Sequence, residues 1–125
     1  LYRDGADQLS DVLRNFIEEG RKVLAIDYEA ALEQAGSLHG DLNEIFSEYD
    51  AILTPTAPGE APVGLDSTGD ASFCTIWTLC GTPALSLPLL QGPNNMPLGA
   101  QLVSYRGDDA RLFRTARWLV ESLEE

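Results

Sequence analysis

The sequence has little positive charge, with eight Lys and Arg residues against twenty Asp and Glu residues and a net charge of -12 at pH 7. Nucleic-acid backbones and anionic membrane surfaces are bound mainly through Lys and Arg, so the balance argues against both as partners. The excess carboxylates are predicted to form a solvated face that aids solubility. A hydrophobic fraction of 44% excludes a mainly disordered chain, and 125 residues suffice for one domain with a real core.

Charge is absent from one long stretch, since residues 71–105 contain no Asp, Glu, Lys or Arg. Four prolines and three glycines divide the stretch into pieces shorter than the roughly 20 residues of a membrane-spanning helix. No basic segment followed by an apolar one opens the chain, so we expect no signal peptide. The first residue is Leu1 rather than Met, which favours an origin in a longer protein.

Cysteine and histidine are scarce, because the chain contains only Cys74, Cys80 and His39. Two cysteines six positions apart on a helix point about 120° away from each other, which is poor geometry for a disulfide. A metal site would need further ligands of this kind. We therefore predict two free buried thiols in a reducing, cytoplasmic compartment, and neither a metal nor a cofactor.

The first fifty residues predict helices alone. An apolar stripe with acids opposite runs through residues 5–20, and Gly20 is a typical helix end. A second pattern covers residues 26–49 but contains Gly36 and Gly40, each of which costs a helix about 1 kcal/mol relative to Ala. The two glycines mark either a break between two helices or a place where another backbone comes close.

Strands and helices alternate from residue 51 onward. Short strands are predicted at 51–54, 84–87 and 98–105, and helices at 71–80 and 107–125. The apolar second strand is predicted to be buried on both faces and to form an antiparallel hairpin with the third. The whole chain, residues 1–125, is thus expected to be a single α/β domain with a small mixed sheet flanked by helices.

The last predicted helix is amphipathic. Its inward face is expected to hold Leu112, Phe113, Ala116, Leu119, Val120 and Leu123. Asp108 and Asp109 stand at its start, where carboxylates cap free backbone N–H groups, so we assign them to capping rather than to a metal.

No complete catalytic site can be identified in the chain. Ser86 lies on the strand predicted to be buried, where a substrate could not reach it. His39 is predicted to be a solvated side chain, and Lys22 has no serine at a recognisable spacing. Phosphate-binding, dinucleotide-binding and zinc motifs are also missing from the sequence.

Four segments nevertheless follow one another in a specific order. They read "DYEAAL", "YDAILTPTAP", "FCTIWTLCGTPALSLP" and "MPLGAQLVSYRGDDARLF". From about residue 20 to the end, the chain resembles the C-terminal part of amidase-signature hydrolases. The resemblance implies hydrolysis of amide bonds by a Ser–cis-Ser–Lys triad. In that family the triad lies upstream of the matched region, so no catalytic residue is assigned in this sequence.

The resemblance also implies a supporting role for this chain. Its strands would belong to a larger mixed sheet, and the helix at 71–80 would line part of the substrate pocket. Ala71 and Thr75, one turn apart, with Cys74 beside them, are the candidate substrate-binding residues, whereas Trp77 and Leu79 are expected to pack into the core. The chain would then form the C-terminal structural and substrate-pocket portion of an amidase, inactive by itself and acting on a small-molecule amide only within the full enzyme.

Two further expectations concern association. An alternative function is a freestanding, non-catalytic binding or scaffold protein that uses the same fold. Without its surroundings, the uncharged stretch would leave apolar area and strand edges bare, and both favour self-association. We therefore expect a homo-oligomer.

Overall fold

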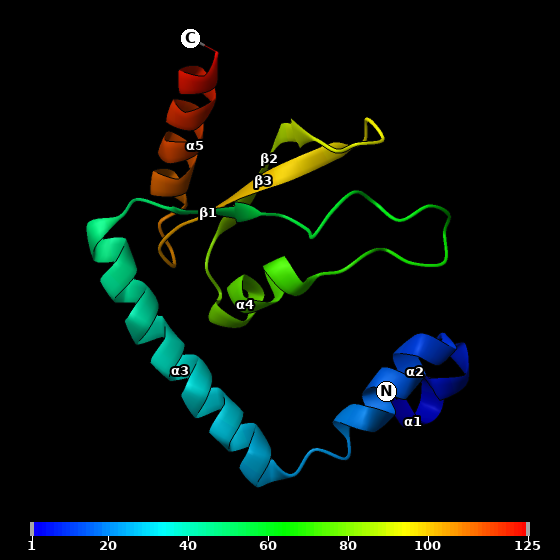
Figure 1. Ribbon diagram of the computed structural model, residues 1–125. Helices are drawn as coiled ribbons and strands as arrows, with labels where there is room; N and C mark the ends of the chain where they lie inside the picture. Colours follow the sequence, from blue (N-terminus) through cyan, green and yellow to red (C-terminus); the bar gives the residue numbers. More distant parts are fainter. Residues whose placement is uncertain (1, 125) are drawn as a thin grey trace. The chain divides into compact units, whose positions relative to one another are not determined.

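Helices alone precede Ile52 in the described part of the chain. The computed structural model describes residues 2–124 (Figure 1). They form two compact units, one that ends at Gln34 and one that begins at Ala35. Whether the two units behave as the single domain expected from the sequence stays a prediction.

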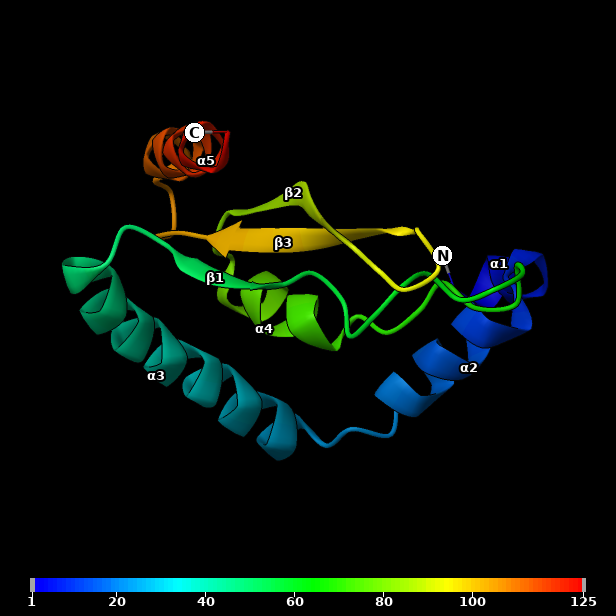
Figure 2. The ribbon, with the colours of Figure 1, turned by 45° about the horizontal axis from the view of Figure 1, so that its top comes forward.

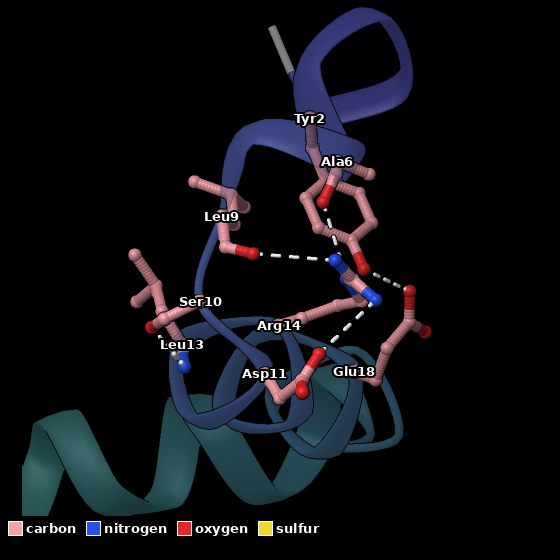
Figure 3. Close-up of polar contacts among 8 residues, drawn as sticks. All are labelled: Tyr2, Ala6, Leu9, Ser10, Asp11, Leu13, Arg14 and Glu18. Carbon is pink, nitrogen blue, oxygen red and sulfur yellow. Dashed lines mark hydrogen bonds and ion pairs between the residues drawn. The ribbon is translucent and has the colours of Figure 1, made fainter.

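The first unit contains the helix α1 (Tyr2–Gly5), the 3-10 turn η1 (Ala6–Gln8) and the helix α2 (Asp11–Gly20). Ser10 caps α2, because its side-chain oxygen accepts a hydrogen bond from the N–H of Leu13 at 3.3 Å. The Arg14 guanidinium donates to the carbonyl oxygens of Ala6 at 3.1 Å and Leu9 at 3.2 Å (Figure 3). Arg14 thereby ties the end of the short N-terminal turn to α2, which ends at the predicted Gly20.

The helix α3 (Ala25–Glu48) runs unbroken through both of its glycines. A Cβ atom built at Gly36 or Gly40 would meet no described atom outside the helix's own nearby backbone within 4 Å. The predicted break is therefore wrong, and no other backbone of the described chain comes close to either glycine. Tertiary packing compensates for the low helix propensity, since Leu42 and Phe46 in the same half of α3 are buried in the core.

Three antiparallel strands form the sheet, namely β1 (Ile52–Pro55), β2 (Ala84–Gln91) and β3 (Pro97–Val103), in the order β1-β3-β2. The predicted α/β fold and the β2–β3 hairpin are confirmed. Every pairing among the described strands is antiparallel, so the mixed pairing expected from the sequence is not seen within residues 2–124. β2 also runs past its predicted end at Leu87, with a register shift between Leu87 and Leu90 around Pro88, which has no N–H to donate.

Helices cover the two faces of this sheet (Figure 2). The second half of α3 and the helix α4 (Ser72–Cys80) lie on one face, and the helix α5 (Asp109–Leu123) lies on the other. Successive side chains of β3 serve opposite faces, because strand residues alternate. Val103 packs with Cys80 on the α3 and α4 face, and Leu102 packs with Leu112 on the α5 face.

The cap of α5 is confirmed, since the Asp108 carboxylate accepts a hydrogen bond from the N–H of Arg111 at 3.0 Å. Other burial predictions need correction. On α5, Phe113 and Leu123 are exposed although both were expected to face inward. β2 is not buried on both faces, because alternate residues from Ala84 onward are exposed. The physical reason is the same in each case: the second unit supplies no further layer over these positions.

Gln101 joins three elements from the middle of the sheet. Its side chain is buried, with 4% of the residue exposed. The Nε2 group donates to the Thr54 hydroxyl at 3.2 Å and to the Phe73 carbonyl at 3.1 Å. The amide oxygen accepts from the Cys74 thiol at 3.6 Å. Buried polar groups are tolerated when they are bonded in this way, so Gln101 fixes α4 to β1 and β3.

The Gln101→Leu variant should be less stable by about 1–3 kcal/mol, because it leaves the Phe73 carbonyl and Thr54 hydroxyl without this partner. Urea unfolding followed by circular dichroism measures the change. The matched control is Ser86→Ala, at the position that pairs with Gln101 on β2 but is exposed. It should shift stability by less than about 0.5 kcal/mol. Equal effects of the two substitutions would contradict the anchoring role.

Candidate functional site

The start of α4 holds the three residues predicted to bind substrate. Ala71 is the exposed N-cap residue, and its carbonyl oxygen accepts hydrogen bonds from the backbone N–H groups of Cys74 at 2.9 Å and Thr75 at 3.1 Å. The Thr75 hydroxyl also donates to this carbonyl, at 2.9 Å. Thr75 is exposed and Cys74 is half-buried. The three residues therefore cluster in the first turn, with Ala71 and Thr75 open to solvent.

Cys74 faces the sheet. Its single S–H proton has two acceptors within reach, the Thr56 carbonyl oxygen at 3.3 Å and the Gln101 amide oxygen at 3.6 Å, so the two contacts share one donor. Both cysteines are free, as predicted. Cys80 is fully buried, but Cys74 is only half-buried, so the prediction of two buried thiols holds for Cys80 alone. The thiol is thus engaged with the sheet, and the assignment of Cys74 to substrate binding stays a prediction.

A hollow of about 410 Å³ lies next to the start of α4. Its walls are the loop segments 56–62 and 68–70 and the first residues of β3 at 97–99. None of Ala71, Cys74 and Thr75 lines it, although its wall ends at Asp70, directly before Ala71. The sequence did not identify this hollow, because the loop has no periodic pattern and its walls come together only through long-range contacts.

Gly99 keeps one wall of the hollow open. The hydroxyl oxygens of Thr56 and Ser86 lie 3.5 Å apart, and a Cβ atom at Gly99 would clash with both. Ser86 is exposed, so the expectation that burial denies it to substrate was wrong. Among the side chains that the structure describes, the hydrogen bond between these two hydroxyls is their side-chain contact, and no basic group joins it.

Glu60 fastens the loop of the hollow to the turn between β2 and β3. Its carboxylate accepts hydrogen bonds from the Asn94 side-chain amide at 2.7 Å and from the backbone N–H of Asn94 at 2.8 Å. The backbone N–H of Met96 donates to it at 3.4 Å. These bonds, above all the one from the Asn94 side chain, hold the pKa of Glu60 below its ordinary value of 4.5. Gly92 leaves room for the carboxylate, since a Cβ atom there would clash with it.

His39 has a structural role and is not the solvated side chain that the sequence predicts. It is half-buried, and its Nε2 atom lies 2.8 Å from the Cys80 carbonyl oxygen. Because a carbonyl only accepts, Nε2 carries a proton in this contact. The bond links α3 to the end of α4. Its ring nitrogen is thus engaged with backbone and is not aimed at any hydroxyl among the described residues.

The remaining predictions for α4 divide between core and surface. Trp77 packs against the core that contains Phe46 and Val103, as predicted. Leu79 is 57% exposed, so its assignment to the core was wrong. Among the side chains that the structure describes, which leave out those of residues 3 and 4, no group of three His, Cys, Asp or Glu could hold a metal ion. None of the described helices has both the length and the apolar character needed to cross a membrane.

Comparisons with known proteins place these features in a family. A sequence model described as Amidase matches residues 3–113. The chain is 29% identical to a mitochondrial glutamyl-tRNA(Gln) amidotransferase subunit of Aedes aegypti, over 99% of this chain and 28% of that protein. It is 36% identical to the corresponding glutamyl-tRNA(Gln) amidotransferase subunit of Thermotoga maritima, over 72% of this chain and 20% of that protein.

A solved structure has the same fold. The match is to a crystal structure of an amidase, with a TM-score of 0.81 and 26% sequence identity, and it covers 97% of this chain and 30% of that one. The chain therefore spans less than a third of the length of these curated relatives and of the solved structure.

The contacts of Glu60 predict a pH dependence of stability. A carboxylate whose pKa is lowered by folding stabilises the protein fully above its ordinary pKa of 4.5, and this contribution is lost as pH falls through the lower folded-state value. In Glu60→Gln this part of the acid destabilisation should disappear. Urea midpoints of both proteins, measured from about pH 3 to pH 7, test the expectation by their difference.

Two further variants sharpen the comparison. Gly92→Ala should displace the carboxylate and behave like Glu60→Gln. Asp66→Asn, in the same loop and exposed, removes a carboxylate for which the structure gives no hydrogen bond, so it should keep the acid profile of the parent. An unchanged profile in Glu60→Gln would contradict the clamp.

Proposed function

Because this chain belongs to the amidase family, we propose that it forms the C-terminal structural and substrate-pocket portion of an amide hydrolase of the Ser–cis-Ser–Lys type. The observation that carries the proposal is the placement of the first turn of α4. Gln101 fixes that turn to the sheet through the Phe73 carbonyl and the Cys74 thiol. The hollow walled by segments 56–62, 68–70 and 97–99 ends at Asp70, directly before the exposed Ala71, and the exposed Thr75 lies one turn farther along α4.

The proposed contribution to the reaction is binding and positioning of the substrate. Among the side chains that the structure describes, no serine, threonine or cysteine is hydrogen-bonded to an acidic or basic side chain, and amide hydrolysis by such a nucleophile needs a base beside it. In this proposal the reacting groups come from outside the 125 residues, and the chain supplies one wall of a pocket for a small-molecule amide. Thr75 offers a surface hydroxyl, and Ala71 leaves space next to it.

Partners and compartment follow from charge and thiol chemistry. A net charge of -12 supports a protein that contacts neither nucleic acid nor an anionic membrane surface directly. The free thiols of Cys74 and Cys80 support a reducing compartment, and we propose the cytoplasm.

The purified 125-residue chain should show no turnover of a simple aryl amide.

Substitutions on α4 test the pocket assignment. In a longer protein that contains this chain and hydrolyses amides, Thr75→Trp should raise KM or lower kcat at least about tenfold, because the indole would project from the pocket wall into the space for the substrate. Thr75→Ser, which keeps the hydroxyl and adds no bulk, is the matched control and should leave both constants within about twofold. Lost stability with unchanged kinetics in Thr75→Trp would place Thr75 in the core instead.

A second candidate function is a freestanding, non-catalytic binding or scaffold protein with the same fold. The lack of a nucleophile–base pair among the described residues is the observation that favours it. The DNA that precedes the codon for Leu1 separates the two candidates. A coding sequence there for a glycine-serine-rich segment, with a lysine some distance before it, supports the hydrolase, and a start codon at that point supports the scaffold.

Self-association is proposed for the purified chain. Within the uncharged stretch, Leu79 is 57% exposed and Leu90 is 53% exposed. The outer edge of β2 pairs with no described strand, and an unpaired edge with apolar neighbours favours pairing with another chain. We expect a dimer or larger species at micromolar concentration, with residues 71–105 at the interface. Sedimentation equilibrium that gives only the 13.6 kDa monomer would overturn this expectation.

A further inference from the structure

The few basic residues of this acidic protein are concentrated near α5. Four of its eight Lys and Arg residues lie between positions 106 and 117. Three of them, Arg111, Arg114 and Arg117, follow one another at every third position of α5, and residues 110–120 contain no Asp or Glu. Residues three apart lie near one another on a helix surface. One side of α5 therefore carries positive charge in a protein whose net charge is -12.

A groove of about 550 Å³ runs between α5 and the segment that leads from α3 into β1. We call it the α5 groove, and its lining includes Tyr49, Asp50, Arg111, Arg114, Thr115 and Trp118. The two aromatic side chains are open to solvent, with Tyr49 62% exposed and Trp118 64% exposed. Exposed aromatic rings beside guanidinium groups are the side chains on which protein–protein binding energy is usually concentrated.

The charges in the α5 groove are only partly neutralised. The Nε group of Arg111 pairs with Asp108 at 3.1 Å, and its Nη1 group donates to the Phe46 carbonyl at 3.0 Å, so Arg111 is fixed in place. No ion pair joins Arg114 to another residue that the structure describes. Asp50 is the one acid in the lining. Arg114 is thus a cation available to an incoming carboxylate.

We propose that the α5 groove docks an acidic segment of a partner protein that also carries an aromatic or leucine anchor. The anchor would lie between Tyr49 and Trp118, and the carboxylates would pair with Arg114 and reach towards Arg117. Opposite charges across an interface speed encounter and fix orientation, and the aromatic contact supplies buried apolar area. The excess of acids elsewhere repels a phosphate backbone, so the chemistry favours a protein segment over a nucleic acid.

This inference is independent of the proposed amide hydrolase. The α5 groove is lined by α5 and residues 49–51. The candidate substrate residues belong instead to the start of α4, and Figure 2 shows α4 and α5 on opposite faces of the sheet. A kinetic test at Thr75 and a binding test at Arg114 can therefore fail separately.

The test uses the 125-residue chain and a short synthetic peptide of glutamates with leucines and one phenylalanine at helical spacing. The chain has two tryptophans, so a Trp77→Phe background leaves Trp118 as a local fluorescent reporter. The peptide should bind at micromolar concentration and change the Trp118 emission. Binding should weaken about tenfold between roughly 50 and 300 mM salt, since exposed charges are screened.

Variants locate the binding. Arg114→Glu should weaken peptide binding about tenfold or more, because it turns an attraction into a repulsion. Arg106→Glu makes the same charge change in the same unit outside the groove and should have less than about a threefold effect. Trp118→Ala, followed by calorimetry, should also weaken binding about tenfold.

Several outcomes would overturn the proposal. One is that a peptide with glutamine in place of every glutamate binds equally well, since acidic recognition would then be absent. Another is that a single-stranded oligonucleotide binds at this groove in preference to the peptide. A third is that neither peptide binds, or that dilution of the chain alone changes the Trp118 emission in the same way, which would assign the groove to a second copy.

Discussion

β3 is the strand on which the second unit depends, because it is the one described strand paired along both edges. Ala100, Gln101, Leu102 and Val103 pair with β1 on one side, and they also pair with β2 on the other. Alternate side chains then enter opposite cores, so a single four-residue segment holds α3 and α4 on one face and α5 on the other. A shift of one residue would exchange the two sets, which is why this register is strongly specified.

The polar residue in that segment determines where the candidate site stands. A buried amide gains little net stability over an apolar side chain, but its hydrogen bonds are directional. Two of the three Gln101 bonds reach α4 and one reaches Thr54 on β1, so together they set the position of α4 against the sheet. Gly99, two residues earlier on the same face, has no side chain and leaves the Thr56 and Ser86 hydroxyls next to one another. On this face of β3, Val103 therefore packs in the core, Gln101 anchors α4 by hydrogen bonds, and Gly99 leaves open space.

Local patterns predicted most elements, and long-range contacts explain what they did not predict. The apolar stripe of α2, the Asp108 cap of α5 and the β2–β3 hairpin depend on residues close in sequence. The bond between His39 and Cys80 and the bond between Glu60 and Asn94 join residues 41 and 34 positions apart. No periodicity encodes such contacts, and for that reason the hollow beside α4 was not found from the sequence.

Burial within this chain does not fully explain why residues 71–105 lack charge. β3 is largely buried, yet Leu79 on α4 and Leu90 on β2 belong to the same stretch and are exposed. Single exposed leucines are common on protein surfaces, so these two positions mark where the described layers end, and only the sedimentation measurement decides whether a second chain covers them. The α5 groove differs, since Arg114 and Trp118 combine charge with an exposed ring. Leu90 pairs with Leu98, which lies on the β3 face that carries Leu102 and faces α5, whereas Leu79 belongs to α4 on the other face, so the uncharged stretch does not form one continuous apolar surface.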